Sequence, residues 1–161
     1  MSPALIPILK TLLFTIFVPG VVAVYVPYLL LGRTYQPHHG PLVWMGDLCI
    51  LGGAFIYFRC AWEFAVHGLG TPAPIAPTKF LVVRGLHCYV RNPMYIGVLL
   101  VVLGQAVLFD APRLAAYGTL CILIAHLFVI SYEEPTLRRQ FGESYEQYLR
   151  AVPRWIPRIR K

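Results

Sequence analysis

The sequence contains little charge for its size. Only 13% of its 161 residues are Asp, Glu, Lys or Arg, whereas a soluble domain usually has about 25%. Apolar residues make up 58% of the chain, and several apolar runs reach the ~20 residues that cross a hydrocarbon core of about 30 Å. These two features exclude an ordinary soluble domain and predict an integral membrane protein.

Several familiar chemical motifs are also absent. The chain has no GxxxxGK[S/T] phosphate loop, no HExxH zinc motif and no GxSxG nucleophile elbow. Its four cysteines form no CxxC, and three of them lie in apolar runs. We interpret them as small buried residues, neither disulfide partners nor metal ligands, and we expect no metal site.

Acidic residues are scarcer than basic ones, with seven against fourteen and a net charge of +7. Half of the basic residues follow Ser131, and three more lie around the central loop. A basic chain can bind nucleic acid, but basic residues crowded beside membrane segments are typical of the cytoplasmic side. We therefore expect no nucleic-acid partner, and we expect both termini to be cytoplasmic.

The hydropathy pattern predicts a single all-α domain over residues 1–161, a polytopic bundle of four or five membrane helices. The Pro19-Gly20 pair and Pro27 predict a kink in the first span, whose freed carbonyls other helices must cover. The third span is short. The expected spans cover residues 5–31, 41–66, 93–109 and 114–132.

Residues 134–150 show apolar side chains at helical spacing among charged ones. This pattern predicts one amphipathic helix on the cytoplasmic face. The tail that follows contains two prolines and is expected to be extended. Its Trp155 is the kind of residue that anchors a chain at a membrane interface.

Among the ionisable residues inside the predicted spans, three are candidates for a functional role. Arg59 and Glu63 are one helical turn apart and can pair; they either anchor the end of their helix or border an active site. His126 is either a buried hydrogen-bonding residue or part of a substrate site. Ionisable groups at membrane depth usually face protein or water, so all three are candidates for contact with substrate.

Two polar stretches stand out, and four spans place both at the same membrane face. Residues 85–97 offer donors, acceptors and aromatic rings, and Glu133-Glu134 offers two carboxylates. Neighbouring helical residues point about 100° apart. One carboxylate could therefore bind a ligand while the other pairs with a basic neighbour. Alternatively, both form an acidic first turn that the helix dipole favours.

Together these stretches resemble the isoprenylcysteine carboxyl methyltransferase family, integral-membrane enzymes related to phospholipid methyltransferases. The motif that carries the resemblance begins with Arg91-Asn92-Pro93-Met94-Tyr95-Ile96-Gly97. It continues with Glu133-Glu134, Leu137, Phe141-Gly142, Tyr145, Tyr148 and Val152-Pro153. The resemblance implies that the methyl acceptor is a membrane lipid or a prenylated, lipid-like molecule at the cytoplasmic face. It also implies that residues 1–66 form N-terminal helices and that residues 67–161 form the cofactor-binding catalytic core.

The resemblance also implies S-adenosyl-L-methionine as the methyl donor, with S-adenosyl-L-homocysteine as product. The expected catalytic residues are Arg91, Glu133 and Glu134. The expected substrate contacts are Arg59, Glu63 and His126. The expected cofactor contacts are Phe80, Leu81, Val82, His87, Tyr89, Arg91, Asn92, Pro93, Met94, Tyr95, Glu133 and Glu134.

Two positions depart from the family pattern. Asn92 stands where the family usually has His; it keeps a donor and an acceptor but cannot become a cation. Val129 stands where members acting on prenylcysteine carry an arginine suited to the substrate carboxylate. Arg59 or Arg91 could substitute for that arginine, and the acceptor stays open.

The chemistry expected is in-line methyl transfer, which chiefly needs alignment and exclusion of water. A carboxylate or thiolate acceptor needs no general base. A lipid amine needs one, and the candidates are Glu63, His87, Glu133 and Glu134.

Two other functions fit part of the pattern. One is a sterol-reductase-like, NADPH-dependent membrane reductase, whose C-terminal stretch is similarly aromatic and basic. The other is a non-enzymatic lipid-binding membrane protein. The glutamate pair and the small size favour the methyltransferase.

Overall fold

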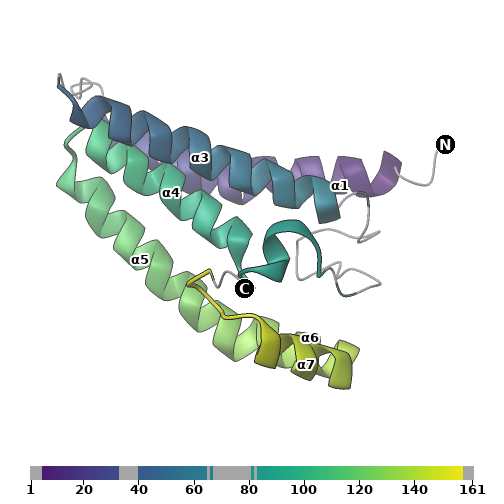
Figure 1. Ribbon diagram of the computed structural model, residues 1–161. Helices are drawn as coiled ribbons and strands as arrows, with labels where there is room; N and C mark the ends of the chain where they lie inside the picture. Colours follow the sequence, from purple (N-terminus) through teal and green to yellow (C-terminus); the bar gives the residue numbers. More distant parts are fainter. Residues whose placement is uncertain (1–4, 33–39, 65, 67–80, 82, 158–161) are drawn as a thin grey trace.

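The computed structural model describes the chain except for residues 1–4, 33–39, 65, 67–80, 82 and 158–161. Every regular element in the described part is a helix (Figure 1). The elements are α1 (Leu5–Phe17), η1 (Val21–Tyr25), α2 (Val26–Leu31), α3 (Leu42–Glu63), η3 (Gly85–Cys88), α4 (Pro93–Leu108), α5 (Pro112–Phe128), η4 (Val129–Glu133), α6 (Glu134–Phe141) and α7 (Glu143–Ala151).

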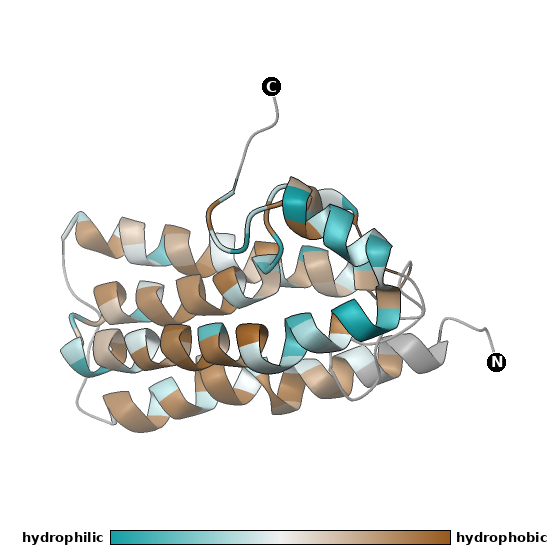
Figure 2. Ribbon diagram, turned by 90° about the horizontal axis from the view of Figure 1, so that it is seen from below, coloured by the Kyte–Doolittle hydropathy of each residue, from teal (hydrophilic) through white to brown (hydrophobic). Residues whose placement is uncertain are grey.

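Three continuous helices are long and apolar enough to cross a membrane: Thr11–Leu31, Leu42–Glu63 and Pro112–Phe141. The predicted third span is α4, which is apolar but shorter. Large apolar side chains such as Trp44 point outward, and the helices are hydrophobic along most of their length (Figure 2). These features confirm the predicted all-α membrane bundle.

The first span is irregular where its prolines predict it to be. The π-helical turn η1 follows Pro19-Gly20 directly. Two carbonyls of that turn are covered by other helices, as expected for a broken membrane helix. The Val22 carbonyl accepts a hydrogen bond from the Tyr117 hydroxyl at 3.0 Å, and the Ala23 carbonyl accepts one from the Gln105 amide at 2.8 Å.

Two pairs of glycines bring α3 and α4 into close contact. A Cβ added to Gly53 would lie 2.5 Å from the Gly97 carbonyl oxygen, and one added to Gly104 would lie 2.8 Å from that of Gly46. The glycines are seven residues apart in both helices, so they line one face of each. Such small-residue contacts let membrane helices approach closely. The equal spacing of the glycines in the two helices is the signal in the sequence for this contact.

The prediction of one amphipathic helix over residues 134–150 is wrong. Gly142 has a φ of +53°, which separates α6 from α7. Because an α-helix needs negative φ, the chain turns at this glycine and packs its two short helices together. Tyr145, Tyr148 and Val152 form the buried cluster there, and Leu81 packs against it.

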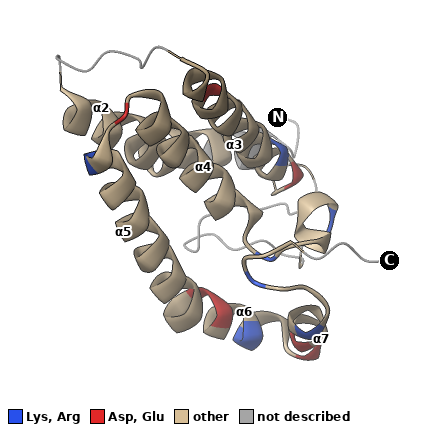
Figure 3. Cartoon of the chain, turned by 60° about the vertical axis from the view of Figure 1, so that its left-hand side comes forward, with Lys and Arg blue, Asp and Glu red and all other residues tan. Residues whose placement is uncertain are grey.

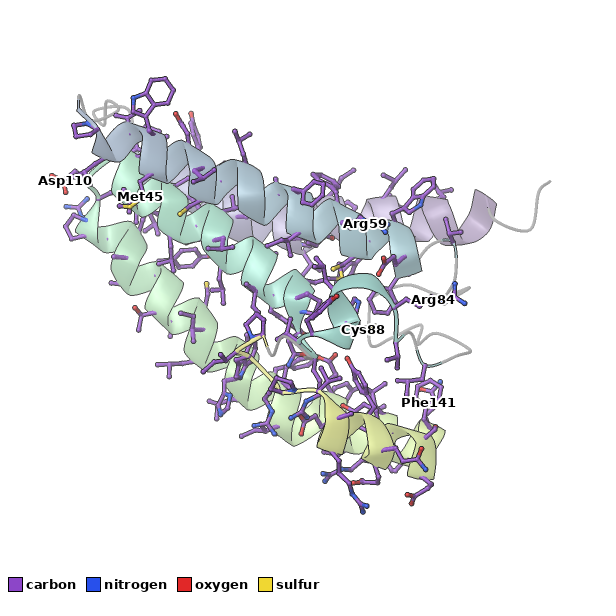
Figure 4. All side chains as sticks on the ribbon, viewed as in Figure 1. Met45, Arg59, Arg84, Cys88, Asp110 and Phe141 are labelled. Atoms are coloured by element: carbon purple, nitrogen blue, oxygen red, sulfur yellow. The ribbon has the colours of Figure 1, made fainter. Side chains whose placement is uncertain are left out.

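Both polar stretches lie at one end of the bundle. In Figure 4, Arg59, Arg84, Cys88 and Phe141 are at this end, and Asp110 is at the opposite end. Charged residues gather beside α6, α7 and the end of α3, while most of the helical surface carries none (Figure 3). The two stretches therefore meet at one end of the bundle, as predicted.

Candidate functional site

Residues 152–155, which follow α7 and are here called the C-terminal strap, join the two motif stretches. The backbone N–H of Arg91 donates to the Pro153 carbonyl at 2.9 Å. The side-chain amide of Asn92, which is buried, donates to the Arg154 carbonyl at 3.1 Å. The strap therefore fixes the start of α4, and it occupies the amide of Asn92.

Glu134 lies at the centre of a buried ion-pair cluster. Its side chain is only 8% exposed, and its Oε1 accepts a hydrogen bond from Arg91 Nη1 at 2.7 Å. Arg154 adds two further bonds, from Nε at 2.8 Å and from Nη2 at 2.9 Å. These bonds to Glu134 raise the pKa of Arg154. Glu134 is thus the carboxylate that pairs with basic neighbours.

Sequence reasoning missed Arg154. It is twenty residues from Glu134, and no helical spacing connects an extended tail to a preceding helix. Tyr145 and Tyr148 were noticed as motif residues but not as part of the site. Both are buried beside the strap, and burial raises the pKa of Tyr145 to about 12 despite nearby Arg91.

Glu133 has different surroundings from its neighbour. It ends the π-helical turn η4, and its Oε2 accepts a hydrogen bond from the Tyr95 hydroxyl at 2.9 Å. Within the described residues, no donor bonds to its other oxygen. The predicted divergence of the two carboxylates is present: Glu134 is paired with arginines, and Glu133 keeps one oxygen for other partners.

The strap also reaches α5 and α4 through Trp155. Its indole N–H donates to His126 Nδ1 at 3.0 Å. Its ring lies edge-on to that of Tyr95, with 6.2 Å between centroids. Trp155 is therefore held by protein partners, although its sequence suggested a membrane-interface anchor.

A second buried polar cluster surrounds Glu63, whose side chain is 5% exposed. Arg59 lies 3.2 Å from Glu63 Oε1, which confirms that these two residues pair. His87 Nδ1 lies 3.9 Å from Glu63 Oε2, and neither atom has a hydrogen-bond partner in the described structure. Burial lowers the pKa of His87 to about 4, so this imidazole is neutral at pH 7. Gly85, at φ +53°, packs its backbone against the same carboxylate.

The remaining predicted contacts are dispersed. Pro93 is buried and Met94 half-buried at the start of α4. Tyr89 is 47% exposed and lines an open groove of about 410 Å³ together with Arg59. Phe80 and Val82 lie outside the described residues.

Comparison with known proteins identifies the class of this membrane bundle. A family model described as phospholipid methyltransferase matches residues 41–144, which is more than half of the chain. The chain belongs to this family. The match runs from α3 through both polar stretches to the start of α7, and it confirms the predicted class of protein.

A curated relative is the protein-S-isoprenylcysteine O-methyltransferase of Schizosaccharomyces pombe, which is 37% identical over 79 residues. The aligned part covers 49% of this chain and 34% of the relative, so the chain matches about a third of that protein's length. No solved structure is significantly similar.

Proposed function

We propose that this protein transfers a methyl group from S-adenosyl-L-methionine to a lipid-like acceptor at the cytoplasmic membrane face. The observation that carries the proposal is the Tyr95–Glu133 pair, because it presents a carboxylate with an open oxygen beside the start of the apolar helix α4. Membership of a methyltransferase family and the name of the yeast relative support it. The basic C-terminal region supports the cytoplasmic side.

The chemistry of the side chains around Glu133 fits this cofactor. S-adenosyl-L-methionine has an ammonium group, two ribose hydroxyls and a sulfonium cation. The open oxygen of Glu133 can accept from the ammonium or from a hydroxyl. The rings of Tyr95 and Trp155 offer faces that attract a cation. When bound, the cofactor supplies an electrophilic methyl group; the protein has to hold and align it.

Glu134 and Arg91 are assigned a positioning role. Arg91 Nη1 lies 2.7 Å from Glu134 Oε1, so their charges neutralise each other. Arg154 donates hydrogen bonds to both oxygens of the same carboxylate. The cluster holds the start of α4 against the start of α6, and thereby sets Tyr95 opposite Glu133. Precise alignment of this kind supplies much of the catalysis in a methyl transfer.

His87 is a poor candidate for the general base. Its lowered pKa of about 4 makes it a weak proton acceptor, since a base works best with a pKa near the operating pH. Among the four base candidates, Glu134 is also disfavoured, because both its oxygens bind arginines. Glu63 and Glu133 remain as candidates if the acceptor is a lipid amine, whereas a carboxylate or thiolate acceptor needs no base.

The test is methyl transfer by the purified protein. Labelled S-adenosyl-L-methionine and a membrane lipid extract should give labelled lipid with the wild type, and at least about tenfold less with Glu133→Gln. Glu143→Gln is the control, because Glu143 is an exposed carboxylate at the start of α7. Transfer at background in the wild type, or equal transfer in both variants, contradicts the proposal.

A further inference from the structure

His126 and Trp155 connect the middle of the last membrane helix with the C-terminal strap. The Trp155 indole bonds to His126 at 3.0 Å and contacts the ring of Tyr95. The Tyr95 hydroxyl in turn donates a hydrogen bond to Glu133. One indole thus joins His126 to the pair that carries the proposed function.

The bond from Trp155 selects one tautomer of His126. An indole N–H can only donate, so the nitrogen that faces it must offer a lone pair. That nitrogen is Nδ1. The neutral imidazole then carries its proton on Nε2, and the ring is fixed in orientation. In the described part of the chain, no acceptor bonds to this Nε2–H.

The surroundings make an unused N–H unusual. His126 is half-buried in an apolar helix, and its neighbours Leu123 and Leu127 are 56% and 60% exposed on the outer surface. A polar group without a partner is unfavourable at membrane depth. Such a group usually faces a ligand, a water-filled space or another polar residue.

We propose that the Nε2–H of His126 binds an oxygen of the acceptor's polar head group, and that Trp155 is the positioning residue that aims it. This inference rests on the proposed function and deepens it. The ligand chemistry is an oxygen acceptor, such as a phosphate, carboxylate or hydroxyl oxygen. The role does not depend on which atom of the acceptor receives the methyl group.

The tautomer can be measured directly. Protein with ¹⁵N-labelled histidine in detergent micelles should show His126 with a protonated Nε2 and a bare Nδ1; His126→Gln identifies the signal. Trp155→Phe should abolish this preference, whereas Trp44→Phe, a change of an exposed tryptophan at the opposite end, should keep it. Addition of membrane lipid extract should shift the Nε2 signal. A protonated Nδ1, or no response to lipid, overturns the proposal.

Paired substitutions test the role in turnover. Gln places an amide donor near the position of Nε2, and Asn places one near Nδ1. His126→Asn should raise the apparent KM for lipid extract about tenfold, the effect of one lost hydrogen bond, and His126→Gln by less than about threefold. S-adenosyl-L-homocysteine should bind both variants like the wild type. Equal KM values for the two variants contradict the assignment.

The two proposals fail in different ways. The NMR measurement needs neither cofactor nor turnover, so it decides the role of His126 even if methyl transfer is absent. Conversely, a normal Kd for S-adenosyl-L-homocysteine together with an unresponsive His126 leaves the methyltransferase intact and removes only this inference.

Discussion

Tyr95 on α4 and Glu133 on η4 are joined by a 2.9 Å hydrogen bond, although 38 residues separate them in sequence. If Glu133 binds the cofactor, this bond sets the direction of its carboxylate. Tyr95→Phe should then lower the affinity for S-adenosyl-L-homocysteine about tenfold with little change in stability. Tyr132→Phe is the control, because Tyr132 is 45% exposed. Equal affinities for the two variants, measured by calorimetry, argue against the assignment.

The ion pair between Arg154 and Glu134 should matter for stability. Arg154→Gln removes two charge-assisted bonds to a buried carboxylate, and we expect a loss of about 1–3 kcal/mol in the free energy of unfolding. The control is Arg138→Gln, which breaks the ion pair between Arg138 Nε and Glu146 Oε1 at 2.9 Å. This pair is exposed, since about half of the Arg138 side chain is accessible to solvent. That control should lose at most about 1 kcal/mol. Equal effects in thermal unfolding contradict the structural role of the strap.

The glycine contact between α3 and α4 can be tested with two adjacent residues. Gly53→Ala forces a Cβ to 2.5 Å from the Gly97 carbonyl, whereas Gly52→Ala meets no atom within 4 Å. We expect Gly53→Ala to destabilise the protein by about 1–3 kcal/mol, since overpacking shifts the backbone. Gly52→Ala should be neutral or slightly stabilising, because Ala favours the helix. Detergent melting curves that coincide for the two variants would count against this close approach.

Gly85 and Gly142 have the same φ of +53° but different surroundings. A Cβ on Gly85 overlaps the Glu63 carboxylate, and one on Gly142 meets nothing within 4 Å. Both Ala substitutions suffer backbone strain of about 1–3 kcal/mol. Gly85→Ala should in addition disturb the Arg59–Glu63 pair and unfold at a lower temperature than Gly142→Ala. The reverse order of Tm would show that Glu63 is not packed on Gly85.

His87 should make stability depend on pH. Its pKa is about 4 in the folded protein because it is buried, against an ordinary value of 6.5. The unfolded chain therefore takes up a proton first as the pH falls. Neutral His87 therefore makes its full contribution to the free energy of unfolding above pH 6.5. Between pH 6.5 and 4 this contribution, up to roughly 3 kcal/mol, is lost. His87→Gln should remove this part of the pH dependence in unfolding experiments; identical profiles for both proteins contradict it.

Local patterns in the sequence predicted the membrane helices well. The apolar runs located α3, α4 and α5, and the prolines located the irregular turn in the first span. The same sequence could not show that Gly142 divides the last amphipathic segment, because a glycine also occurs inside helices and only its positive φ ends one.

Contacts between distant segments were harder to predict. The divergence of Glu133 and Glu134 follows from helix geometry, and it was expected. The partner of Glu134 on the strap was not, because Arg154 lies in an extended tail without periodicity. The same holds for the bond between Trp155 and His126, which joins residues 29 apart. Such contacts depend on how the strap folds back over α4 and α5.

The most direct test of the central claim is calorimetric titration of the purified protein with S-adenosyl-L-homocysteine and, separately, with NADPH. We expect the wild type to bind S-adenosyl-L-homocysteine and not NADPH. We expect Glu133→Ala to insert and melt normally but to lose most of this affinity. Binding of NADPH alone, or undiminished binding of S-adenosyl-L-homocysteine by Glu133→Ala, would contradict the account.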